Sequence, residues 1–263
     1  MERMELENLR LTVEGPLVWV TIDRPAALNA LNQATIAELG RVMEACAEDD
    51  AVRVILLRGA GSRAFVAGAD IRELAEVDAA EGMRLSEAGQ RVFRRMEQLG
   101  KPVIAVIDGF ALGGGCELAM ACTLRLASEA AKLGQPEVKL GLVAGFGGTQ
   151  RLPRLVGRGA ALKLLLTGSL VGAQEALRMG LVDEVVSAEQ LTDRARALAM
   201  EIAANAPVAI QQTLDVVDCG LDCSLDDGLR MEADAFGTCC ATADMREGTR
   251  AFLEKRTALW TGR

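Results

Sequence analysis

The chain has 263 residues, of which 50% are apolar, and it carries a formal net charge of -8 at pH 7 and no His. This length and apolar content can bury a sizeable core, whereas the acidic balance disfavours a general polyanion binder. Without His, imidazole catalysis, Ser–His or Cys–His nucleophiles and imidazole metal sites are excluded, so any proton transfer relies on carboxylates or thiols.

Strands and helices are expected to alternate along the chain, which indicates an α/β protein. Alternation on both sides of Gly15 predicts a β-hairpin, and continuous apolar runs predict buried strands. The strands are expected at 9–15, 17–23, 52–59, 102–108, 123–128 and 181–186. Apolar residues at helical spacing, with Asn32 and Asp70 placed as N-caps, predict the helices. The helices are expected at 32–49, from 70, at 80–99, at 115–122 and in stretches from 147 onward.

A helical tail is expected beyond a capping box at Ser187-x-x-Gln190, with breaks near Pro207, Gly220 and Gly237. We therefore divide the chain into a region of ββα units that carries the active site, residues 1–200, and a C-terminal helical region, residues 201–263. The tail has apolar stripes, which predict packing on the body or on a neighbouring subunit. The stripe residues are Ile202, Val208, Ile210, Leu214 and Val217.

The stretch GGGCELAMAC, residues 113–122, places Glu117 inside a run of small and apolar residues. Its glycines precede a helix whose first N–H groups lack internal acceptors and lie at the positive end of the helix dipole. A developing negative oxygen would be stabilised there, about one helical turn from Glu117. Taken alone, Glu117 is more simply interpreted as a first-turn acid that complements the dipole.

A second glycine-lined turn, AFVAGAD at 64–70, can supply another N–H donor. Two converging donors form an oxyanion hole, and each is worth roughly 3 kcal/mol of transition-state stabilisation. The loop GQPEVKLG at 134–141 adds Glu137, which alone would be interpreted as a surface acid. Two carboxylates and two N–H donors around one carbonyl would form a proton-transfer site that needs no His.

Together these motifs resemble the crotonase, or enoyl-CoA hydratase/isomerase, superfamily. The motifs are RPAALNAL, AFVAGADI, DGFALGGGCELAMAC, LGQPEVKLGLVAGFGGTQRL and EGTRAFLEKR, in the family's order and approximate spacing. The resemblance implies a spiral of repeated ββα units and a helical C-terminal region that joins subunits into a homotrimer or hexamer. It also implies an acyl-CoA thioester substrate, with coenzyme A as part of the substrate and no further cofactor or metal.

The resemblance also assigns roles to four residues. The N–H groups of Ala69 and Gly114 would hold the thioester oxygen, Glu117 would act mainly as the base for water, and Glu137 mainly as the acid at Cα. Both acid–base positions are glutamate, which is the pattern of the hydratases. We therefore expect an enoyl-CoA hydratase that adds water syn across the 2,3 double bond of a 2-enoyl-CoA, giving a 3-hydroxyacyl-CoA. The two carboxylates should titrate as a coupled pair, with burial keeping one protonated at neutral pH.

Two positions depart from the family pattern. Ala26 stands where many members carry Lys or another polar residue that can reach the CoA phosphates. Ala144 occupies a position that is often proline, which predicts a looser loop over the acyl chain. The residues expected to contact CoA are Arg24, Ala27, Leu28 and, from the tail or a neighbouring subunit, Lys255 or Arg256.

Two other functions compete with hydration. A double-bond isomerase needs the oxyanion hole and one proton-shuttling carboxylate, so the presence of both Glu117 and Glu137 favours hydration. A non-catalytic RNA-binding member, a role that some relatives fill with a lysine-rich helix, is disfavoured because the helix at 32–49 carries Arg41 among several acids. We therefore expect no nucleic-acid partner.

The compartment follows from the first residues and the cysteines. The start, MERMELENLR, is too charged for a signal peptide, and no uncharged apolar run is long enough to cross a bilayer. Seven Cys, an odd number, favour reduced thiols over a disulfide framework, so we expect a cytoplasmic protein. The pairs Cys219/Cys223 and Cys239/Cys240 lack C-x-x-C spacing, so small buried residues are a better interpretation than a soft-metal site.

Overall fold

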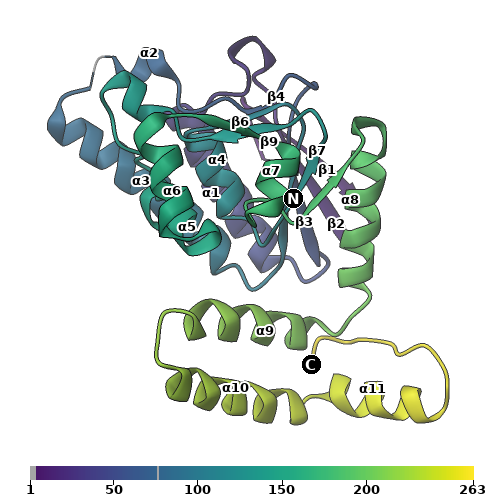
Figure 1. Cartoon of the computed structure of the whole chain (residues 1–263). Helices are drawn as coiled ribbons and strands as arrows, with labels where there is room; N and C mark the ends of the chain where they lie inside the picture. Colours follow the sequence, from purple (N-terminus) through teal and green to yellow (C-terminus); the bar gives the residue numbers. More distant parts are fainter. Residues whose placement is uncertain (1–3, 76) are drawn as a thin grey trace.

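The computed structural model describes residues 4–75 and 77–263, so the first three residues of the charged start lie outside it. At its centre is a six-stranded sheet in the order β1-β2-β3-β5-β7-β10 (Figure 1). Its strands are β1 (Leu9–Glu14), β2 (Leu17–Ile22), β3 (Val54–Gly59), β5 (Val103–Ile107), β7 (Leu124–Ser128) and β10 (Glu184–Val186). The β1–β2 hairpin is antiparallel and the other neighbours are parallel, so the predicted hairpin and buried strands are confirmed.

A second, smaller sheet has the order β4-β6-β8-β9. Its strands are β4 (Ala64–Val66), β6 (Phe110–Leu112), β8 (Lys132–Gly134) and β9 (Leu170–Gly172). Along the chain, β3, β5 and β7 of the large sheet are each followed by one short strand of the small sheet, namely β4, β6 and β8. Each turn of the chain thus adds one strand to each sheet, which is the predicted spiral of ββα units.

Helices connect these strands and form the C-terminal part of the chain (Figure 1). They are α1 (Gln33–Glu48), α2 (Ile71–Leu74), α3 (Ala79–Glu97), α4 (Gly114–Met120), α5 (Gly148–Val156), α6 (Arg158–Thr167), α7 (Ala173–Arg178), α8 (Ala188–Ala203), α9 (Pro207–Gly220), α10 (Leu225–Cys240) and α11 (Ala243–Leu253), with 3-10 turns η1 (Pro25–Ala27) and η2 (Glu137–Leu140). The predicted caps hold: Asn32 accepts from the N–H of Thr35, and Asp70 accepts from the N–H of Arg72.

Two details of the predicted tail are wrong. Ser187 is the N-cap of α8, but its side chain makes no capping hydrogen bond, so no capping box forms with Gln190. The helix α10 continues through Gly237, because an exposed glycine at this point only weakens a helix and does not end it. The breaks at Pro207 and Gly220 are confirmed.

The large sheet is buried on both faces, and its alternating side chains enter two clusters. Val18 and Val20 of β2 point into the main core with α1 and α3, whereas Leu17 and Trp19 point to the opposite face. There they meet the apolar side of α8, which consists of Leu191, Ala195 and Ala199. The helix α8 therefore packs on the sheet as part of the body.

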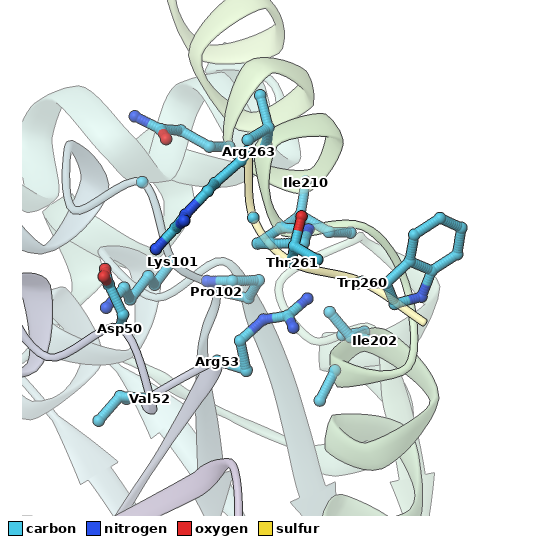
Figure 2. A pocket seen from close by; sticks show the side chains of 16 residues that line it. Asp50, Val52, Arg53, Lys101, Pro102, Ile202, Ile210, Trp260, Thr261 and Arg263 are labelled. Carbon is cyan, nitrogen blue, oxygen red and sulfur yellow. The ribbon is translucent and has the colours of Figure 1, made fainter. Parts of the chain in front are cut away.

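The helices α9, α10 and α11 lie apart from the two sheets (Figure 1). The chain end returns to their junction with the body, where Trp260 Nε1 donates to Ala204 O at 2.6 Å and Asp244 accepts from the N–H groups of Thr261 and Gly262. The junction lines an open pocket of about 300 Å³, shown in Figure 2. The division into 1–200 and 201–263 stays a prediction.

Candidate active site

A pocket of about 310 Å³ opens at one edge of the small sheet. Its lining includes Ala67 and Gly113, which directly follow β4 and β6, and Pro136, two residues after β8, because the carboxyl ends of parallel strands meet at the same edge. Ala69, Gly114, Glu117 and Glu137 all line this one pocket. The structure therefore brings together all four residues that were assigned to catalysis.

The N–H groups of Ala69 and Gly114 are suited to bind an oxygen. Leu31 donates to Gly68 O and accepts from the N–H of Asp70, both at 2.8 Å. Because successive N–H groups of an extended chain point to opposite sides, that of Ala69 points away from Leu31. Gly114 is the first residue of α4, so its N–H has no acceptor within the helix. A Cβ built on Gly114 would lie 3.5 Å from Ala69 N, so the two groups are close.

Two of the three glycines before Glu117 are required by the local structure. Gly113 has a φ of 50°, in the left-handed region, and a Cβ there would lie 2.7 Å from Glu137 Oε1. A Cβ on Gly115 would lie 2.0 Å from Val66 O, so glycine is needed for α4 to pack directly on β4. Gly113 thus allows the turn, and Gly115 allows α4 to pack closely on β4.

Glu117 is buried on α4, with 1% of its surface exposed. Its Oε1 accepts two hydrogen bonds, from the N–H groups of Phe146 and Gly148, both at 2.7 Å. The pKa of Glu117 is raised to about 7, because burial and the neighbouring Glu137 raise it by more than the two N–H donors lower it. A carboxyl with a pKa near neutrality is well matched to accept or donate a proton at physiological pH.

Glu137 begins η2, lines the same pocket and is half-buried. Burial raises its pKa as well. The buried amide of Gln135, with its nitrogen turned toward the carboxylate, donates to both oxygens of Glu137 at 3.0 and 3.1 Å. An amide donates to an ionised carboxylate with its nitrogen and accepts from a protonated one with its oxygen. Gln135 can therefore serve both protonation states of Glu137.

The predicted CoA contacts lie outside the lining of this pocket. Leu28 O accepts from the N–H of Ala67 at 3.1 Å, so the turn that contains Ala27 and Leu28 runs beside the segment at 67–69. Arg24 donates to Asp70 at 2.9 Å and to Ala30 O, and thus fixes this turn.

The two predicted contacts from the tail follow α11, in the C-terminal part of the chain. Lys255 is exposed there, and Arg256 is paired with Glu247 and Glu254. Their contacts with CoA stay predictions.

Sequence reasoning missed the apolar wall of the pocket. It consists of Ile71, Leu74, Val77, Leu85, Leu140, Leu142, Val143 and Phe146. Several of these side chains are open to solvent, among them Val143, which is 72% exposed. Exposed branched side chains beside two carboxylates suit an acyl chain. The apolar residues of the stretch LGLVAGF, residues 140–146, could have indicated this wall from the sequence.

Three predicted absences concern metals, disulfides and membranes. Within residues 4–75 and 77–263, no group of three or more Cys, Asp or Glu side chains is arranged to hold a metal ion. No disulfide joins the cysteines of the described chain. In the same ranges, no helix is long and apolar enough to span a membrane.

Comparison with known proteins defines the class. The family model for enoyl-CoA hydratase/isomerase matches residues 12–263. The short-chain-enoyl-CoA hydratase of Clostridium acetobutylicum is 49% identical over 96% of this chain and 97% of its own length. The crotonyl-CoA hydratase of Syntrophomonas wolfei is 47% identical over 97% of this chain and 98% of its own length. The structure of an enoyl-CoA hydratase from Bacillus anthracis superimposes with a TM-score of 0.95 at 39% identity, covering 98% of this chain and all of that one.

The chain therefore belongs to the enoyl-CoA hydratase/isomerase family. The predicted α/β spiral is confirmed, and so is the prediction of an enzyme of the enoyl-CoA hydratase type.

Proposed function

We propose that this pocket hydrates short 2-enoyl-CoA thioesters, with Glu117, Glu137, Ala69 and Gly114 in the roles predicted above. The observation that carries the proposal is that two carboxylates and two open N–H groups line one pocket with an apolar wall. The names of the two relatives, short-chain-enoyl-CoA hydratase and crotonyl-CoA hydratase, support a short acyl chain.

In the proposed reaction, the N–H groups of Ala69 and Gly114 bind the thioester oxygen. They polarise the carbonyl, which makes Cβ electrophilic, and they stabilise the enolate that forms when water adds. Glu117 takes a proton from water as the oxygen attacks Cβ, and Glu137 gives a proton to Cα on the same face. Water supplies the OH at Cβ and gives its proton to Glu117, and Glu137 supplies the proton at Cα. One proton then passes from Glu117 to Glu137, directly or through solvent, and restores both side chains for the next turnover.

The assembly, location and partners complete the proposal. Exposed apolar residues on α9 and α10 support burial between subunits of a homotrimer or hexamer. The proposed reaction uses only the protein, water and the acyl-CoA. We therefore propose that the enzyme needs no further cofactor and no nucleic-acid partner. We also propose a cytoplasmic location, which the odd number of seven Cys supports because it favours reduced thiols.

The first test separates the two glutamates. Purified protein is given a panel of 2-enoyl-CoA esters, and the products are identified by a mass gain of one water. Glu117→Gln should lose hydration, by a hundredfold to ten-thousandfold, yet it can retain exchange of Cα protons in a saturated acyl-CoA. Glu137→Gln should lose both reactions. Each change keeps the side-chain size, so a large rate loss reports chemistry and not packing.

Near-normal hydration by either variant would remove that glutamate from the mechanism. An efficient double-bond shift that survives in Glu117→Gln alone would make isomerisation the better assignment. Hydration and the exchange of Cα protons are both measured on assembled protein, whose mass is checked by light scattering.

A further inference from the structure

The peptide group between Gly145 and Phe146 joins helix α3 to Glu117. On one side, Gly145 O accepts hydrogen bonds from Ser86 Oγ at 2.5 Å and from Gln90 Nε2 at 2.9 Å. On the other side, the N–H of Phe146 donates to Glu117 Oε1 at 2.7 Å. One planar peptide group therefore connects α3 to the carboxylate on α4.

One face of α3 is built to hold this loop. Ser86, Gly89, Gln90 and Phe93 recur at i, i+3, i+4 and i+7, so they lie on the same side of the helix. The ring of Phe146 packs on Gly89, where a Cβ would lie 2.4 Å from a ring carbon, and meets the Phe93 ring edge-on with 5.7 Å between centroids. Gln90 Nε2 also donates to Ser86 Oγ at 3.0 Å. The same face thus fixes both the backbone and the ring of residue 146.

We propose that Ser86 and Gln90 are positioning residues that fix Glu117 through the peptide group between Gly145 and Phe146. This inference rests on the proposed role of Glu117 as the base. Hydrogen bonds to a peptide carbonyl polarise the peptide and strengthen the bond that its N–H donates. With Oε1 held in this way, Oε2 of Glu117 is the oxygen that receives the proton from water.

Other charged groups also face Glu117. Beyond burial, which raises its pKa most, Glu137 of η2 raises the pKa and Arg151 of α5 lowers it. Arg151 is paired with Glu97 of α3 at 2.5 Å and donates to Phe146 O at 2.8 Å. The hydrogen bond from the N–H of Phe146 favours the ionised form of Glu117, so weakening that bond should raise the pKa further.

The test is the pH dependence of kcat/KM for crotonyl-CoA hydration in Ser86→Ala and Gln90→Met. We expect the acid limb to move to higher pH by about half a unit, which lowers the rate about threefold below the limb and leaves it little changed above. The control is Gln98→Met, the same type of change at an exposed position at the C-terminal end of α3. It should leave the profile unchanged.

An unmoved acid limb in both variants, or a rate loss that is equal at every pH, would overturn the inference, because a merely structural role does not move the limb. If Ser86→Ala fails to assemble, Gln90→Met decides alone, since Gln90 is exposed. Glu117→Gln separates the two proposals. If that variant still hydrates, the proposed function fails. If it is inactive while the limb stays in place, only the positioning role fails.

Discussion

At the scale of single residues, the site depends on where one carboxyl is buried. Glu117 is taken out of water, yet two N–H groups hold one of its oxygens at 2.7 Å. Burial disfavours the charged form and the hydrogen bonds favour it, and burial is the larger effect, which leaves the pKa at about 7. A chain without His thus obtains a group that titrates in the range where His usually does.

This pKa predicts the pH dependence of the reaction. A base must be ionised to accept a proton, and a carboxyl with a raised pKa becomes protonated as the pH falls through about 7. We therefore expect kcat/KM to fall about tenfold per pH unit below that value. Initial rates between pH 5 and 9 check this, with light scattering at each pH as the control for assembly. A flat profile down to pH 5 would contradict it.

The proposed oxyanion donor, the N–H of Gly114, makes a separate prediction. Gly114→Pro deletes the N–H, and we expect a rate loss of roughly a hundredfold or more. Gly114→Ala keeps the N–H and measures the steric part of the loss, because its Cβ would lie 3.1 Å from the ring of Phe146 and 3.5 Å from Ala69 N. A smaller loss in Gly114→Ala than in Gly114→Pro, with both variants assembled, assigns the effect to the N–H. Near-normal hydration by an assembled Gly114→Pro variant would leave the donor without a role.

At the scale of elements, the sequence predicts long elements and misses short ones. The strands β3 and β5 in the middle of the large sheet are buried and show as apolar runs, whereas β1 and β2 show as alternation on both sides of Gly15. The strands β4, β6, β8 and β9 have three residues each, too few to show a period, so their segments are interpreted as loops or left unassigned. These short strands place the turns that bear Ala69 and Gly114. The pocket could thus be predicted only from the family resemblance, since no local pattern brings three distant turns together.

The packing of α3 on the loop at 145–147 is testable through two glycines of one helix. A Cβ at Gly89 would lie 2.4 Å from the buried ring of Phe146, so Gly89→Ala should destabilise the protein by about 1 to 3 kcal/mol and reduce hydration. The nearest atom to a Cβ at Gly82 is 4.0 Å away, so Gly82→Ala should stabilise it by up to about 1 kcal/mol. Denaturant unfolding at one protein concentration measures both. If both variants changed the free energy of unfolding in the same direction, the proposed packing of Phe146 on Gly89 would be refuted.

At the scale of the whole molecule, the body and the C-terminal helices differ in what they leave exposed. The large sheet has both faces covered, whereas α10 presents an apolar stripe to solvent. Leu225, Leu229 and Phe236 recur at i, i+4 and i+11, which places them on one face of the helix, and they are 77%, 51% and 72% exposed. An apolar stripe of this kind on a folded chain marks an interaction surface.

The proposed homotrimer accounts for this stripe, because a second copy of the chain would cover it. We expect light scattering at micromolar concentration to give the mass of a trimer or hexamer, and Phe236→Asp to reduce that mass, since a carboxylate would have to be buried in the interface. Asp234 lies on the opposite side of α10 from the stripe, two residues before Phe236, so Asp234→Lys is the matched control and should leave the mass unchanged. Circular dichroism must show that both variants remain folded. A monomeric wild-type chain would rule out the assembly, and an unchanged mass in folded Phe236→Asp would exclude this stripe as the contact, because a buried unpaired charge cannot be accommodated without loss of affinity.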